Sequence, residues 1–241
     1  MAVFCLAAAC SIDARMVTVN DSQQVTPTTV CQGMPVQRDL ITDFSDAFVA
    51  PDHDGKPGVG FAQGPVPGGG VSYLFAAPGL ASPRLSLEPR GDDRALRIDA
   101  NPGVPIGDDN YYLGFGLGFG GDTQICVDAS GYQGVSFTLD GSTGTCQLMF
   151  QVEISQDYRI GSNTQIASCT LGEACYPPYS RPLVVDGPMT HAIPFSALAN
   201  GNPVGMVDMT AITSVGWKLF APLNGPPCQA SLLLDDVAFF R

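Results

Sequence analysis

Hydrophobic and polar residues alternate along much of the chain from position 39 onward. The clearest case is residues 111–121, where every second residue is large and apolar and the residues between are Tyr112 and then four glycines, YYLGFGLGFGG. A period of two is typical of a β-strand, in which successive side chains point to opposite faces. One face of this strand is therefore expected in the core, and the other is nearly bare backbone. Because glycine weakens a strand, such a stripe is expected where a ligand or another backbone comes close.

The same alternation, with turn residues between the segments, predicts about ten short strands. Besides the glycine-faced strand they lie at 39–44, 71–77, 83–88, 95–100, 134–140, 147–155, 190–195, 211–220 and 230–240. A Gly/Pro-rich loop is expected at 51–70 and only a short helical turn at 195–199. Many short strands without a convincing helix predict an all-β fold, an antiparallel β-sandwich of the jelly-roll kind.

Strand parity also predicts the chemistry of the outer face. Gln151 and Glu153 lie opposite the apolar positions of their strand, and Lys218 lies opposite a set that includes Trp217. Trp217, the only tryptophan, is therefore expected in the core. An outer face with amide, carboxylate and ammonium groups beside bare glycine suits the hydroxyls of a sugar. Alternatively, these groups are simply the solvated side of a sandwich.

Composition and charge narrow the class of protein. The chain has 241 residues, enough for one all-β domain with a tail, and 28 glycines and 20 prolines suit a turn-rich fold. Its formal net charge is −12, with only 11 Lys and Arg and no basic cluster. This balance argues against a nucleic-acid partner and against adhesion to anionic lipid by charge alone.

The cysteines and the N-terminus indicate export. There are eight cysteines without CxxC spacing and only two histidines, a pattern that favours disulfides over a zinc site. Cys10 follows an apolar run ending LAAA, which resembles the lipobox of bacterial lipoproteins. We therefore expect a lipoprotein signal with an acylated Cys10 in residues 1–10, a polar tether in 11–38 and the folded domain in 39–241, in a protein exported to the outer membrane or cell surface. The alternative is an ordinary apolar N-terminus, since the run is short and no Lys or Arg precedes it.

Spacing predicts two of the disulfides. Cys169 and Cys175 lie five residues apart in a loop and are expected to pair locally, whereas Cys146 and Cys228 each precede a long strand and are expected to pair with each other. The remaining cysteines stay unassigned at this stage.

Several segments together resemble a known family. LITDF near the start, YYLGFGLGFGG, CVDASGYQGVSFTLDG, DMTAITSVGWKLF and a terminal LLLDDVAFF resemble the galactose-binding-like jelly rolls. The chain is most similar there to family-eleven carbohydrate-binding modules and to the related domain of the complex-I intermediate-associated protein. The resemblance implies glycan binding on the concave face of one sheet, with aromatic residues at its edge. The matching residues would be Tyr112, Gly114, Gly116, Gln151, Glu153 and Lys218, with a rim of Tyr158, Arg159, Tyr176 and Tyr179.

The resemblance also implies a structural calcium ion near the first and last strands, held by Asp43, Asp46, Asp235 and Asp236. These carboxylates could instead cap strands in contact with water.

Catalysis has less support in the sequence. Asp140 and Glu153 could share a face as a carboxylate pair, and His191 is expected at the rim, but no hydrolase or phosphate-loop motif is present. We therefore expect binding of a polysaccharide or glycan without cleavage. The alternatives are a structural or protein-interaction module and, third, a glycan-active enzyme.

Overall fold

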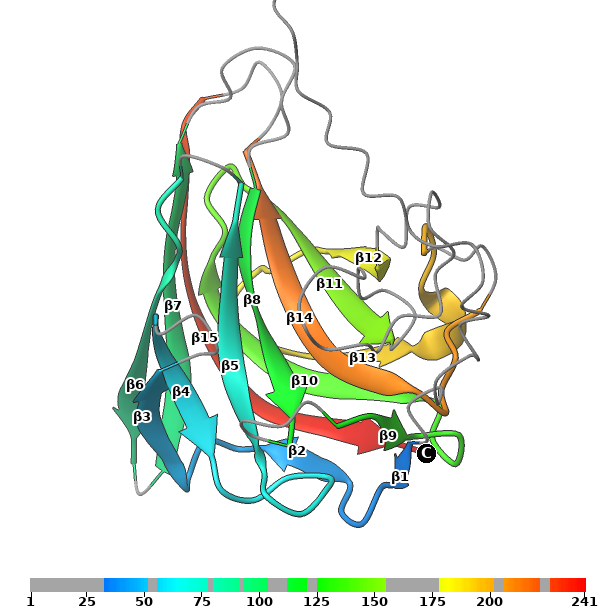
Figure 1. The fold of residues 1–241 in the computed structure, drawn as a ribbon. Helices are drawn as coiled ribbons and strands as arrows, with labels where there is room; N and C mark the ends of the chain where they lie inside the picture. Colours follow the sequence, from blue (N-terminus) through cyan, green and yellow to red (C-terminus); the bar gives the residue numbers. More distant parts are fainter. Residues whose placement is uncertain are drawn as a thin grey trace, which may run out of the picture.

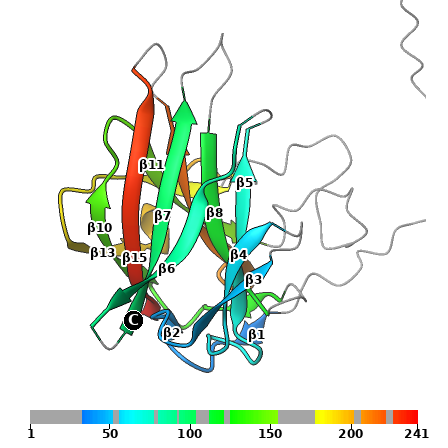
Figure 2. The same ribbon diagram turned by 90° about the vertical axis from the view of Figure 1, so that its left-hand side faces the viewer.

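The computed structural model describes residues 33–51, 56–77, 80–91, 93–103, 112–120, 125–154, 178–201, 206–221 and 226–241. Within these ranges the strands form two curled sheets that pack face to face (Figures 1 and 2). The pairing is antiparallel throughout the two sheets except between β1 and β9. This arrangement confirms the predicted antiparallel β-sandwich of the jelly-roll kind.

The first sheet carries the glycine-faced strand at its centre. Its main order is β12-β11-β14-β8-β5-β4-β3, and β9 pairs at one end of β14 and brings in β1. The strands are β1 (Met34–Pro35), β3 (Ala47–Pro51), β4 (Pro57–Phe61), β5 (Gly70–Ala76), β8 (Tyr112–Phe119), β9 (Val127–Asp128), β11 (Gln147–Ile154), β12 (Tyr179–Leu183) and β14 (Ile212–Phe220).

The second sheet has the order β13-β10-β15-β7-β6, with β2 beside the end of β15. Its strands are β2 (Leu40–Thr42), β6 (Arg84–Arg90), β7 (Asp93–Gly103), β10 (Gly134–Ser142), β13 (Met189–Pro194) and β15 (Cys228–Phe240). A 3-10 turn, η2 (Phe195–Ala197), follows β13 where a short helical turn was predicted. In the ranges described, no helix is long and apolar enough to cross a membrane.

An aromatic cluster fills the space between the sheets. Trp217 is fully buried, as parity predicted, and its ring stacks on Phe115 with centroids 5.1 Å apart. Phe137 from the second sheet meets the same indole edge-on at 5.1 Å, and Phe150 packs against it at 5.6 Å. Burying such large rings is the main source of stability for a sandwich core.

The predicted disulfide between Cys146 and Cys228 is present, with the two Cα atoms 4.9 Å apart. It joins the residue before β11 to the first residue of β15, and so links the two sheets covalently. Cys126 is also disulfide-bonded. The predicted Cys169–Cys175 pair and the lipidation site Cys10 lie outside the described residues.

Sequence patterns missed the shortest and most glycine-rich strands. β4 lies inside the segment predicted as a Gly/Pro-rich loop, and β1 lies inside the predicted tether. β1 depends on a partner distant in sequence, because Met34 donates its backbone N–H to the carbonyl of Cys126 at 2.8 Å. β4 pairs with its neighbours along the chain, β3 and β5. Pairing of this kind leaves no periodicity in a two-residue or glycine-rich segment.

Candidate functional site

The glycine stripe of β8 is covered by aromatic side chains from the neighbouring strand β5. A Cβ atom at Gly116 would lie 2.3 Å from Cζ of Tyr73, and one at Gly114 would lie 2.4 Å from Cζ of Phe75. Real Cβ atoms essentially never come this close to another heavy atom. The glycines are therefore required because the two rings lie flat against their backbone.

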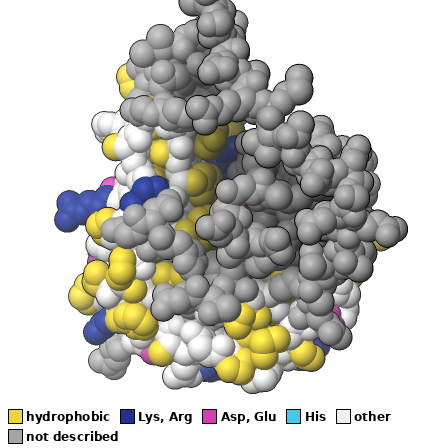
Figure 3. All heavy atoms as spheres, viewed as in Figure 1, with side chains coloured by type: hydrophobic (Ala, Val, Ile, Leu, Met, Phe, Trp, Pro, Cys, Tyr) yellow, Lys and Arg dark blue, Asp and Glu magenta, His cyan; other side chains and the backbone are white. Residues whose placement is uncertain are grey.

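Four half-buried rings form a continuous row on this outer face, from Tyr73 through Phe75 and Tyr112 to Phe220. Adjacent centroids lie 6.1, 6.5 and 6.3 Å apart. The cross-strand register places Phe220 opposite Tyr112, and Phe75 opposite Gly114. We call these four residues the aromatic row. In Figure 3, which views this face from the front, a narrow strip of hydrophobic side chains is visible over the upper part of the sheet.

A chain of hydrogen bonds fixes one end of the aromatic row. The Ser214 hydroxyl donates a hydrogen bond to Oε2 of Glu153 at 2.9 Å. This bond uses the only proton of the hydroxyl. The Tyr73 hydroxyl, 2.9 Å from the Ser214 oxygen, therefore donates to Ser214. Gln151 donates to Oε1 of Glu153 at 3.5 Å. These hydrogen bonds hold the Tyr73 ring in position, because the other three side chains are buried and cannot move freely: Gln151, Glu153 and Ser214.

Lys218 contacts two rings of the aromatic row. Its Nζ is 3.8 Å from the centroid of the Tyr112 ring and 4.8 Å from that of Phe220, which is the geometry of a cation–π contact. Burial lowers the pKa of Lys218, and the negative charge of Glu153 opposes that shift. The ammonium thus orders two rings of the row.

The register confirms that the predicted residues of β8, β11 and β14 share one face. Gln151 pairs with Gly216, which pairs with Gly116, and Lys218 pairs with Gly114. The predicted rim differs. Tyr179 is only 1% exposed and packs into the core, so it is not a rim residue. The other three predicted rim residues, Tyr158, Arg159 and Tyr176, lie outside the described residues.

The strongest elements of the site, Tyr73 and Phe75, are absent from the sequence prediction. Both faces of β5 are apolar: Leu74 is buried in the core, while Tyr73 and Phe75 point outward over the glycines. Parity alone does not tell the two sides of such a strand apart. One feature of the sequence indicates these two residues: two aromatic residues alternate on one strand, and glycines alternate on another strand that could lie beside it.

The four predicted calcium ligands each have a protein partner. Asp43 accepts hydrogen bonds from the N–H and hydroxyl of Ser45, and Asp46 accepts one from the N–H of Gln63. Asp235 forms an ion pair with Arg90 at 3.3 Å, and Asp236 lies within 3.5 Å of the Thr138 hydroxyl. In the described ranges no three His, Cys, Asp or Glu side chains gather as a metal site would require. Calcium binding by these four residues stays a prediction.

The groups considered for catalysis do not converge. Asp140 lies on β10 of the second sheet and Glu153 on β11 of the first, so they do not share a face. His191, expected at the rim, stacks on the core residue Phe137 with centroids 5.4 Å apart, and burial lowers its pKa.

Comparisons with known proteins find distant matches among solved structures. No family model and no curated protein matches the chain. It is similar to the family 11 carbohydrate-binding module of the cellulosomal cellulase Lic26A-Cel5E of Clostridium thermocellum, with 14% identity over 70% of this chain and 86% of that one and a TM-score of 0.47. It is also similar to a module of Caldicellulosiruptor saccharolyticus, CBM27-1, solved with mannohexaose, with 16% identity over 65% and 82% of the two chains and a TM-score of 0.35. Their likeness to this chain is one of fold. Identities and TM-scores this low leave the function to be argued from the site.

Proposed function

We propose that this chain is a non-catalytic glycan-binding protein that holds a sugar chain on the outer face of its first sheet. The aromatic row carries the proposal. Four partly exposed rings side by side present apolar faces on which the C–H faces of sugar rings can stack. Soluble proteins seldom leave so many aromatic side chains together on a surface without a binding role.

The construction of the row supports binding over mere surface packing. Tyr73 and Phe75 lie against glycine backbone, and the Ser214–Glu153 hydrogen bonds also fix Tyr73. Lys218 orders the other two rings of the row. Rings held in place before a ligand arrives lose little conformational entropy on binding, which raises affinity. A surface that only faced water would gain nothing from this preorganisation.

Affinity electrophoresis of the full chain through gels containing soluble polysaccharides tests the proposal. Tyr73→Ala and Phe75→Ala should each weaken retardation about fivefold to tenfold, the usual cost of truncating an aromatic anchor. Tyr73→Phe keeps the ring but loses the bond to Ser214, and should have a smaller effect. Met206→Ala, which truncates an apolar side chain that is 83% exposed elsewhere, is the matched control and should change nothing.

Other outcomes would favour the competing functions. If no polysaccharide retards the protein, the glycan proposal fails. The protein-interaction alternative then gains, since edge strand β3 exposes Phe48 by 51% and Val49 by 80%. Release of reducing sugar from a retained polysaccharide would instead make the protein an enzyme.

We also propose that the protein is exported and anchored at the cell surface through an acyl group on Cys10. The support is the LAAAC sequence at the N-terminus. Metabolic labelling with a fatty-acid analogue in a bacterial host should mark the wild-type chain and the Cys5→Ser control, but not the Cys10→Ser variant. Equal labelling of all three would refute the anchor.

A further inference from the structure

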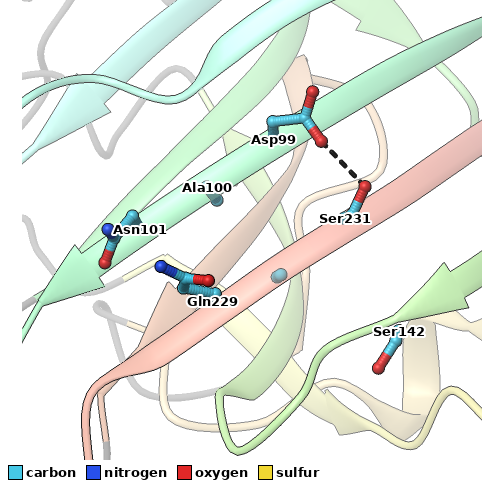
Figure 4. A pocket seen from close by; sticks show the side chains of 7 residues that line it. Asp99, Ala100, Asn101, Ser142, Gln229 and Ser231 are labelled. Carbon is cyan, nitrogen blue, oxygen red and sulfur yellow. Dashed lines mark hydrogen bonds between the residues drawn. The ribbon is translucent and has the colours of Figure 1, made fainter.

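A second concave site lies on the opposite side of the sandwich from the aromatic row. It is a shallow pocket of about 450 Å³ on the outer face of the second sheet, between β7, β15 and the end of β10. Five of its seven lining residues have polar side chains (Figure 4); the lining consists of Asp99, Ala100, Asn101, Ser142, Gln229, Ala230 and Ser231. Its volume falls within the range of small-molecule sites in proteins.

A β-bulge shapes this pocket. Ala230 pairs with Ala100 but Cys228 pairs with Gly103, so Gln229 faces two residues of β7 instead of one. A bulge redirects side chains locally and is often found next to functional sites. Figure 4 shows the side chains of Asn101 and Gln229 next to one another on the two neighbouring strands. The Cys146–Cys228 disulfide anchors the residue before Gln229, so this wall of the pocket is held in place.

The carboxylate of Asp99 is fixed within the pocket. It accepts a hydrogen bond from the Ser231 hydroxyl at 2.7 Å, drawn in Figure 4, and both its oxygens lie 3.3 Å from Nε of Arg97. Arg97 also donates to Glu88 at 3.0 Å and to the oxygen of Ser231 at 2.7 Å. The hydrogen bond from Ser231 and the bonds and charge of Arg97 together hold the pKa of Asp99 below its usual value.

The charges around the pocket exclude two kinds of ligand. Arg97 and Arg84 balance Glu88 and Asp99, because Arg84 pairs with Asp99 across β6 and β7. A metal ion would need several carboxylates. Among the residues that line this pocket only Asp99 carries a carboxylate, and it already forms an ion pair with Arg97. An anion is disfavoured because it would meet the Asp99 carboxylate, and all three nitrogens of Arg97 already donate to protein side chains. The remaining chemistry is that of mixed hydrogen-bond donors and acceptors without net charge.

We propose that this pocket is a second carbohydrate-binding site, which takes one residue of a neutral, hydroxyl-rich sugar. Sugar hydroxyls both donate and accept, so they can form hydrogen bonds with the Asp99 carboxylate, the two amides and the Ser142 hydroxyl, which all line the pocket. The site has no aromatic ring, so it gives orientation and selectivity with modest affinity. It is independent of the aromatic row, which lies on the other sheet.

Titration of the ¹⁵N-labelled full chain with glucose, galactose, mannose and xylose, each added alone, tests this site. At least one of these sugars should shift the side-chain amide signals of Gln229 and Asn101 in a saturable way, with the Gln229 signal assigned by its loss in Gln229→Ala. That variant should weaken the response of Asn101 about fivefold to tenfold, the cost of one or two hydrogen bonds. Gln37→Ala, at an exposed glutamine elsewhere, is the matched control and should leave the titration unchanged.

The aromatic row and the pocket can fail separately. Tyr73→Ala should weaken retardation by polysaccharide gels about fivefold to tenfold yet leave the sugar response of Asn101 and Gln229 intact. If none of the four sugars gives saturable shifts, or if the Asn101 response is the same in Gln229→Ala, the pocket is not a carbohydrate site. Either result would leave the proposal for the aromatic row standing on its own gel experiment.

Discussion

Replacing Gly116 by alanine tests how the aromatic row is built. The new Cβ would lie 2.3 Å from Cζ of Tyr73, whereas ordinary contacts of such atoms begin near 3.4 Å. The three atoms nearest to the new Cβ all belong to the Tyr73 side chain, so the ring must move outward by about 1 Å. A shift of that size breaks the 2.9 Å hydrogen bond between Tyr73 and Ser214.

Three energies decide how Gly116→Ala changes the stability of the fold. Losing the hydrogen bond costs about 0.5–1.5 kcal/mol, and forcing the ring off its rotamer costs about the same. Alanine returns about 0.4–1 kcal/mol by restricting the unfolded chain. Gly116→Ala should therefore lower the free energy of unfolding by about 1 kcal/mol. Because the ring no longer lies in line with Phe75, glycan affinity should fall about as much as in Tyr73→Ala.

Gly118 offers a matched control on the same strand and the same face. A Cβ there would meet its nearest atoms at 3.6 and 3.9 Å, which is ordinary contact. Gly118→Ala should therefore be neutral or stabilise the fold by about 0.5 kcal/mol. In a domain of this size the two variants should differ by about 3–6 °C in Tm, at about 2–4 °C per kcal/mol.

A double-mutant cycle decides whether Tyr73 is the cause. Chemical denaturation is measured for Gly116→Ala and Gly118→Ala, each with Tyr73 and with Tyr73→Ala. Once the ring is gone, alanine at 116 should be tolerated as well as alanine at 118. The reasoning is refuted if Gly116→Ala costs the same with and without the ring, or if it is as stable as Gly118→Ala in the parent chain.

Four further predictions follow from the core, the ion pairs and the acidic turns. Replacing both Cys146 and Cys228 by serine should cost about 4.5 kcal/mol, the chain-entropy value for a link across 82 residues; denaturation showing less than about 1 kcal/mol would contradict it. Tryptophan emission should be blue-shifted and should not change when a glycan binds, because Trp217 is fully buried on the core side of the sheet; a change on binding would place the ligand elsewhere. The pKa of Asp99 in the folded protein lies below its ordinary value of 3.8. The ionised carboxylate therefore stabilises the fold fully above pH 3.8, and this stabilisation is lost as the pH falls through the folded pKa. In thermal melts over that pH range, Asp99→Asn should lose less stability than the parent chain does. If the predicted calcium ion is bound, EDTA should lower the Tm and excess Ca²⁺ should restore it; an unchanged Tm would remove calcium from Asp43, Asp46, Asp235 and Asp236.

The sequence by itself determined the fold class and the orientation of the longer strands. Alternation in residues 134–140, 147–155 and 211–220 requires one apolar face, because a slip by one residue would turn that face to water. This requirement alone placed Trp217 in the core and put Lys218 on the outer face. The sequence also predicted that Cys146 pairs with Cys228, since two cysteines that each precede a long strand can meet at the same end of the sandwich.

Only the tertiary structure decided what covers the glycine stripe. A bare lane on one strand accommodates a sugar, a backbone or a side chain equally well, and the choice depends on which strand lies beside it. Register with β5 placed Tyr73 and Phe75 over Gly116 and Gly114, some forty residues away in the sequence. The same holds for the bulge at Gln229, because a bulge is a mismatch between two strands and neither strand records it alone. Local periodicity specifies which way a side chain points, whereas contacts between distant strands specify what it meets.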